Sequence, residues 1–155
     1  MKNDMQNYNS SCFNKELCIR NANEFYEVAQ LLDKQRAHGE YRYLIPWIVN
    51  LSFACELYLK YLLGRRTNNC KNGHNLFDIY NNLPSPEIKY QINEAFDSKW
   101  VRSFEESLLI CDKYFVDFRY IHEKDDDWSV YTSDLFRIVH ALYTVCNPSQ
   151  QWIHS

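Results

Sequence analysis

The segment Tyr43–Arg66 (YLIPWIVNLSFACELYLKYLLGRR) constrains the fold more than any other part of the chain. It is apolar almost all the way round a helical wheel, whereas a helix at the surface of a globular protein shows one apolar stripe. The segment therefore predicts a helix that other helices enclose. Its middle carries a carboxylate, Glu56, with Lys60 one turn later. Because an unpaired charge is costly at a buried position, Glu56 needs a partner.

The same segment is about long enough to cross a bilayer. It contains Asn50, Glu56 and Lys60, however, and charged side chains at mid-span are expensive. We therefore expect a buried helix of a soluble protein without a membrane span. The N-terminus (MKNDMQNYNSS) is polar and shows no signal peptide, and three of the six cysteines fall on apolar helical faces. We expect a reducing, cytoplasmic setting with free thiols.

The composition favours helices and gives no sign of a general nucleic-acid binder. The chain has 155 residues, which suits one domain, and its 3 Gly and 4 Pro allow few tight turns. The formal net charge of -3 predicts no overall attraction to nucleic acid. A local basic patch would still be compatible with this charge.

Apolar periodicity and helix-ending residues divide the chain into segments. We expect tails over 1–14 and 148–155 and one domain over 15–147. Within the domain the pattern predicts helices at about residues 15–37, 43–64, 74–83, 86–96, 101–123 and 132–146. The expected fold is therefore all-α, an antiparallel bundle of four to five helices plus a short helix.

Particular residues fix where two of these helices begin or end. Pro46 has no N–H to donate, so it must lie in the first turn of its helix or kink it. Gly64 is expected to end the same helix. Thr132 or Ser133 is expected to cap the last helix.

Glu56 and Lys60 are the first candidates for a functional site. Their i, i+4 spacing, with Glu leading, makes a favourable helical ion pair. On a helix this apolar, the pair is either a structural contact in the core or one side of a polar site. The residue pattern leaves both interpretations open.

The second candidate is the sequence FRYIHE at residues 118–123. On a continuous helix Arg119 and His122 would be neighbours, with Glu123 beside them. An Arg beside a His could hold a phosphate and transfer a proton. Alternatively, Arg119 pairs with Glu56 or Glu123. In that interpretation His122 bonds to the last carbonyls of its helix.

His74 is the third candidate, at the start of a predicted short helix. It could cap that helix or reach the groove beside the helix that contains Glu56. Cys70 and His74 have the spacing of half a zinc site, but no second pair stands at such spacing, so we expect no metal and no cofactor. The sequence has no glycine-rich phosphate loop, Ser-centred elbow or HExxH motif.

Three blocks, in this order, resemble the HEPN superfamily of small helical bundles, which are common in prokaryotic toxin–antitoxin and defence systems. The blocks are Ala54, Glu56, Lys60, Leu62 and Leu63; then Gly73, His74, Leu76, Ile79 and Leu83; then Phe118, Arg119, Tyr120 and Glu123. They fall within about residues 43–146, which is most of the predicted domain.

The resemblance implies a homodimer with functional groups gathered in a polar cleft. The residues expected in that cleft are Glu56, Lys60, His74, Arg119, Tyr120, His122 and Glu123. Arg119 and Lys60 would hold an RNA phosphate or a nucleotide-like anion, and Tyr120 would stack on a base. In a metal-independent endoribonuclease of this type, His122 would be the general acid or base. Arg119 would then stabilise the charge that develops on the phosphate.

The chain departs from the ribonuclease pattern of that superfamily in one respect. Four to six residues separate the Arg and the His there, whereas two separate Arg119 from His122. The resemblance also covers non-catalytic members and regulatory partners of nucleotidyltransferases. The alternative function is therefore a helical interaction module whose polar cluster is a structural brace and which acts through a protein partner.

Overall fold

All regular secondary structure in the described part of the chain is helical. The computed structural model describes residues 13–36, 42–64, 75–124, 127 and 129–150, and it forms no strand in these ranges. The helices are α1 (Lys15–Arg36), α2 (Leu44–Leu63), α3 (Leu76–Asn81), α4 (Pro86–Ala95), α5 (Phe104–Cys111), α6 (Tyr114–Arg119) and α7 (Thr132–Cys146), with 3₁₀ turns η1 (Ile121–Glu123) and η2 (Pro148–Gln150). The all-α prediction is confirmed. None of the helices in these ranges is long and apolar enough to cross a bilayer.

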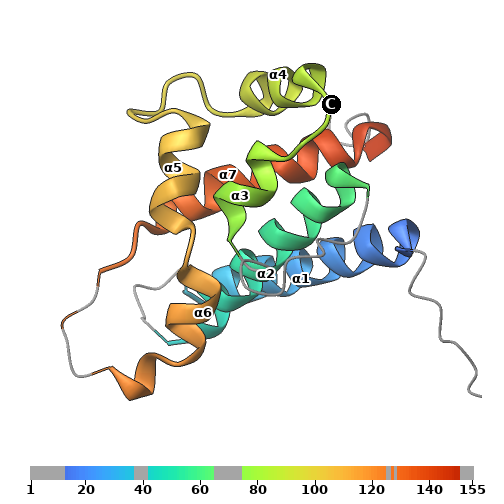
Figure 1. Ribbon diagram of the computed structural model, residues 1–155. Helices are drawn as coiled ribbons and strands as arrows, with labels where there is room; N and C mark the ends of the chain where they lie inside the picture. The colour runs from blue at the N-terminus through green and yellow to red at the C-terminus, as the bar shows by residue number, and fades with distance from the viewer. Residues whose placement is uncertain (1–12, 37–41, 65–74, 125–126, 128, 151–155) are drawn as a thin grey trace, which may run out of the picture.

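Helix α2 is the central element, as its apolar pattern predicts. Helices α1, α3, α6 and α7 all pack against it (Figure 1). Ile48 and Leu59 project from one side of the helix and Ala54 from another, and none of the three has exposed surface. A helix that is apolar all round requires neighbours on several sides, and α2 has them.

The helices do not all alternate in direction. The Sγ of Cys18, in the first turn of α1, lies 3.2 Å from the carbonyl oxygen of Leu57, so α1 begins beside the second half of α2 and runs antiparallel to it. Cys146, the last residue of α7, lies beside Tyr58 in that same half, so α7 runs parallel to α2 (Figure 1). The predicted antiparallel bundle is therefore wrong for this pair. Helices α3 to α6 return the chain from the C-terminal end of α2 to its N-terminal end, where α7 begins.

The ends of α2 follow the prediction. Pro46 lies in the first turn, where its missing N–H has no intrahelical partner to lose. Gly64 ends the helix in the left-handed conformation, with φ at 69°. Its N–H donates to the carbonyl oxygens of Lys60 (3.0 Å) and Tyr61 (3.1 Å).

The predicted cap of α7 is wrong, although the bounds of the helix are correct. The N-cap residue is Tyr131, and neither Thr132 nor Ser133 holds that position. The N–H of Tyr131 donates to the hydroxyl of Tyr114 at 3.0 Å. A tertiary contact to α6 therefore sets the start of this helix. At its other end, the predicted C-terminal tail begins with the turn η2.

The prediction of one long helix over 101–123 is also wrong. The helical segment starts at Phe104 and is divided into α5 and α6. Ser103 and Glu106 form a reciprocal capping box that starts α5. The helix then ends at Asp112, whose carboxylate accepts the N–H of Phe77 at 2.9 Å in the first turn of α3. Burial raises the pKa of Asp112, and the N–H of Phe77 acts against that rise. This bond joins α3 to the junction between α5 and α6.

Four cysteine thiols, those of Cys18, Cys55, Cys111 and Cys146, are free and buried. Burial raises the pKa of Cys18 to about 11, and it raises the pKa of the other three thiols further. Because the thiolate is the nucleophile, we expect these residues to resist alkylation by iodoacetamide at pH 8 in the native protein. Peptide mapping before and after unfolding in urea tests this. Alkylation of native Cys55 at the unfolded rate would contradict the packing around α2.

Candidate functional site

The buried carboxylate of Glu56 forms a close ion pair with Lys60. Glu56 is 1% exposed, and its Oε1 lies 2.5 Å from the Nζ of Lys60, whose side chain is 21% exposed. The carboxylate faces the core while the ammonium reaches towards solvent. This arrangement lets Lys60 keep part of its hydration and still neutralise the buried charge.

Arg119 is the last residue of α6, and its side chain is exposed. Its guanidinium lies 5.4 Å from the ring centroid of Phe115 and 4.8 Å from that of Tyr120. Its Nη2 also donates to the hydroxyl of Tyr120. Neither ion pair that the sequence allowed for it, to Glu56 or to Glu123, forms between these described side chains. Arg119 contacts aromatic rings instead.

His122 and Glu123 lie just beyond, in η1. The side chain of His122 is 73% exposed and that of Glu123 is 67% exposed, with 3.9 Å between Nε2 and Oε1. Because α6 ends at Arg119, the helical spacing used to place His122 does not apply. We call Arg119, Tyr120, His122 and Glu123 the α6–η1 surface.

The structure therefore brings together only part of the predicted cleft. The α6–η1 surface is exposed and continuous in the chain, whereas Glu56 is enclosed within the bundle. His74, the remaining predicted residue, lies outside the described residues, as does Cys70. Within the described ranges, no group of three or more His, Cys, Asp and Glu side chains could hold a metal ion.

Sequence reasoning missed a buried carboxylate that accepts several hydrogen bonds, that of Asp134. It is 1% exposed, and its Oδ1 accepts from the indole N–H of Trp100 (2.9 Å), the Nε of Arg102 (2.8 Å) and the hydroxyl of Ser107 (2.8 Å). Its Oδ2 accepts from the Nη2 of Arg102 at 2.7 Å. Burial opposes the charge, but these donors outweigh it and lower the pKa of Asp134 to about 2.

One feature of the sequence could have indicated that Asp134 is buried. Asp134 occupies the helical stripe that continues through Ile138 and Leu142, both fully buried. A charge on an apolar stripe indicates a buried partner. The partner residues could not be named, because Trp100 and Arg102 lie in a loop that only the tertiary fold brings to α7.

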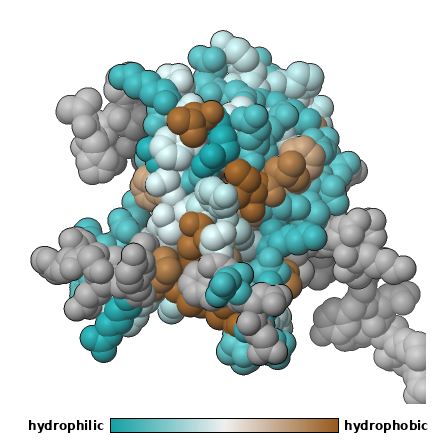
Figure 2. Space-filling model, turned by 90° about the vertical axis from the view of Figure 1, so that its left-hand side faces the viewer, coloured by the Kyte–Doolittle hydropathy of each residue, from teal (hydrophilic) through white to brown (hydrophobic). Residues whose placement is uncertain are grey.

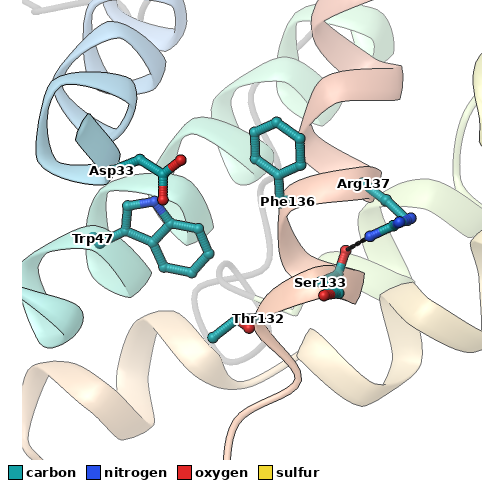
Figure 3. Close-up of a pocket in the computed structure, with 6 residues that line it drawn as sticks. All are labelled: Asp33, Trp47, Thr132, Ser133, Phe136 and Arg137. Atoms are coloured by element: carbon teal, nitrogen blue, oxygen red, sulfur yellow. Dashed lines mark hydrogen bonds between the residues drawn. The ribbon is translucent and has the colours of Figure 1, made fainter. Parts of the chain in front are cut away.

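Arg137, on α7, lines two neighbouring cavities. Its guanidinium is 3.7 Å from the ring centroid of Trp100, and its Nε lies 3.2 Å from Oδ2 of Asp97. The cavities hold about 200 and 250 Å³ and share Phe136 and Arg137 in their linings. Figure 3 shows the first of them. The second cavity also reaches His140. Burial lowers the pKa of that imidazole, whose Nδ1 lies 3.0 Å from the hydroxyl of Tyr26.

No protein-family model, curated protein or solved structure matches this chain. The function must therefore follow from the chemistry of the described side chains. Among the described residues, the α6–η1 surface and the cavities beside Arg137 both offer polar and aromatic groups.

Proposed function

We propose that the protein binds single-stranded RNA at the α6–η1 surface and does not cleave it. The observation that carries this proposal is the exposed contact between the guanidinium of Arg119 and the ring of Tyr120. Unpaired bases stack on tyrosine rings and on guanidinium planes, and a guanidinium also donates two parallel hydrogen bonds to a phosphate. The Arg119–Tyr120 pair can therefore stack on the base of one nucleotide and donate hydrogen bonds to its phosphate.

The surroundings favour binding over cleavage. A catalytic His and Arg must reach the same phosphate, in a site where charge stabilisation is strong because water is excluded. His122 and Arg119 are both exposed to solvent, and the sequence between them lacks the spacing of the superfamily's ribonucleases. We propose that His122 contacts RNA as a hydrogen-bond donor or acceptor.

The HEPN resemblance and the homodimer that it implies remain part of this proposal. Figure 2 shows separate apolar patches among hydrophilic residues on the face at the left of Figure 1. Exposed apolar side chains of α5 and α6 include Leu109 at 57% and Val116 at 42%. Such residues support a contact between copies, and a protein partner such as a nucleotidyltransferase is the alternative.

Fluorescence anisotropy with a labelled RNA of about ten nucleotides tests the binding site. We expect Arg119→Ala and Tyr120→Ala each to weaken binding about 5- to 100-fold, because a stacked base or a guanidinium–phosphate contact contributes roughly 1–3 kcal/mol. Lys99→Ala removes one positive charge from another exposed position and serves as the control. Its effect should be small at moderate salt.

Two outcomes would contradict the proposal. Equal loss of affinity in Lys99→Ala and Arg119→Ala would mean that RNA responds to overall charge and not to this surface. Cleavage of the RNA in EDTA, abolished by both Arg119→Ala and His122→Ala, would instead show that the protein is a metal-independent ribonuclease. Folding of each variant is checked by its helical circular dichroism.

A further inference from the structure

Two asparagine side chains form a reciprocal pair between α1 and the residue that follows α7. The Nδ2 of Asn23 donates to the Oδ1 of Asn147 at 2.9 Å, and the Nδ2 of Asn147 donates to the Oδ1 of Asn23 at 3.0 Å. The two carboxamides are therefore joined in a ring by two hydrogen bonds. Each outer edge of this ring carries the second N–H of one amide beside the second lone pair of the other.

One outer edge of the pair is satisfied inside the fold. The Oδ1 of Asn23 also accepts from the hydroxyl of Tyr58 at 2.7 Å. The Nδ2 of Asn147 also donates to the carbonyl oxygen of Tyr143 at 2.9 Å. Tyr58 has no exposed surface, so this edge is directed towards the core.

The opposite edge is directed towards a cleft between α1 and the end of α7. Asn23 and Asn147 both line this cleft, which holds about 520 Å³ and has Ile19 and Tyr61 among its other lining residues. The edge presents the second N–H of Asn23 beside the second lone pair of the Oδ1 of Asn147. Within the described residues no group bonds to either of them. A few fixed polar groups beside an aromatic ring are typical of sites for small ligands, and the volume is within their range.

A donor beside an acceptor is the pattern that an asparagine side chain presents to adenine. In that pairing the amide N–H donates to N7 of the base, and the amide oxygen accepts from the N6 amino group. In the cleft, Asn23 supplies the donor and Asn147 supplies the acceptor. Guanine matches less well on the same edge, because its N7 and O6 are both acceptors. The ring of Tyr61 offers a surface on which the base can stack.

We propose that this cleft binds an adenine base through the free edge of the Asn23–Asn147 pair. The base belongs either to a small adenine compound or to a single-stranded RNA. Recognition comes from the neutral hydrogen-bonding edge and not from the charged side chains of the lining, which include both Arg20 and Glu24. The site shares no residue with the α6–η1 surface, so it holds or fails separately from RNA binding there.

Titration of ¹⁵N-labelled protein with adenosine tests the site through the side-chain amide signals. We expect the signals of Asn23 and Asn147 to shift. Asn93 is the internal reference, because its Nδ2 is held by the carbonyl oxygen of Lys89 at 2.7 Å on α4. Purine riboside lacks the N6 amino group and leaves the Oδ1 of Asn147 without a donor, so it should bind about 5- to 100-fold more weakly. Equal binding of the two nucleosides, or no shift of Asn23 at millimolar adenosine, would overturn the proposal.

Matched variants separate the hydrogen-bonding edge from the stacking surface. Asn23→Asp replaces the donor by an oxygen and should weaken adenosine binding by a similar factor, in protein whose helical circular dichroism is unchanged. Tyr61→Leu leaves the amide pair in place and should weaken binding about 5- to 100-fold, the scale of one lost base–aromatic stack. Tyr90→Leu removes the same ring from an exposed position of α4 and should leave the affinity unchanged. Adenosine binding that survives Tyr61→Leu, or that falls equally in Tyr90→Leu, would contradict the site.

A titration with tetra-adenylate identifies the source of the base. A shift of the Asn23 signal with tighter binding than that of adenosine indicates a base of single-stranded RNA. Equal or tighter binding of adenosine indicates a small adenine compound.

Discussion

Asp134→Ala is expected to lower the free energy of unfolding by about 3–5 kcal/mol, the usual cost of removing one partner from a buried ion pair. The carboxylate is 1% exposed and accepts hydrogen bonds from Trp100, Arg102 and Ser107. Its loss leaves the buried hydroxyl of Ser107 without this acceptor and breaks the link between α7 and the loop before α5. Urea unfolding followed by circular dichroism measures the change.

The control for this variant is Asp97→Ala, which removes a more exposed carboxylate paired with another arginine, Arg137. A surface ion pair contributes little, so the control should be close to the wild type. If Asp134→Ala were as stable as Asp97→Ala, the hydrogen bonds of Asp134 would not be what holds α7 to α5 and to the loop before it.

The same carboxylate predicts a dependence of stability on pH. The pKa of Asp134 is about 2 in the folded protein, below its usual value of 3.8, because its donors favour the charged form. A lowered pKa means that the contribution to stability is fully present above about pH 4 and is lost as the pH falls towards 2. Asp134→Asn should lack this step in acid titrations, and a step of unchanged size in that variant would contradict the pKa assignment.

Glu56→Ala is the second substitution with a large expected effect, again a loss of about 3–5 kcal/mol in the free energy of unfolding. The deletion leaves a space inside the bundle and removes the partner of Lys60, 2.5 Å away. A double-mutant cycle with Lys60→Ala should give a coupling of about 0.5–3 kcal/mol. Glu87→Ala, at an exposed position of α4, should change stability by less than about 0.5 kcal/mol.

RNA affinity decides whether Glu56 is a brace or part of a site. In the folded fraction of Glu56→Ala, measured at low temperature, we expect the affinity of the wild type. A variant of unchanged stability that no longer binds RNA would contradict the structural role. It would return Glu56 to the polar cleft that the HEPN resemblance implies.

The central helix could be predicted from the sequence because local information determines it. An all-round apolar pattern, Pro46 near the start and Gly64 at the end are sufficient to give α2 its bounds within one residue. The bounds of α4 and α7 are equally close for the same reason. Burial follows from apolar periodicity alone, so the enclosure of α2 was predictable too.

The division between α5 and α6 could not be predicted in this way. The apolar stripe through Leu108, Cys111, Phe115 and Phe118 continues across the break, so its period gives no warning. The break depends on the bond between Asp112 and the N–H of Phe77, which are 35 residues apart. Extending the helix through this point placed His122 beside Arg119 on one continuous helix, whereas α6 ends at Arg119 and His122 lies in η1.

The candidate site was predicted in part for a related reason. Arg119 and Tyr120, which are neighbours in the chain, do contact each other, although their role in a site stays a prediction. Contacts between distant segments, such as the hydrogen bonds of Asp134 with Arg102, depend on the packing of helices that sequence spacing does not encode.

Photo-crosslinking tests the central claim, RNA binding at the α6–η1 surface, most directly. A single-stranded RNA carrying 4-thiouridine is irradiated with the wild-type protein, and the crosslinked peptides are identified by mass spectrometry. We predict that the main crosslink falls on Tyr120 or its neighbours at residues 119–123, and that Tyr120→Ala reduces it. Crosslinks concentrated on α1 or α4, and unchanged in Tyr120→Ala, would contradict the claim.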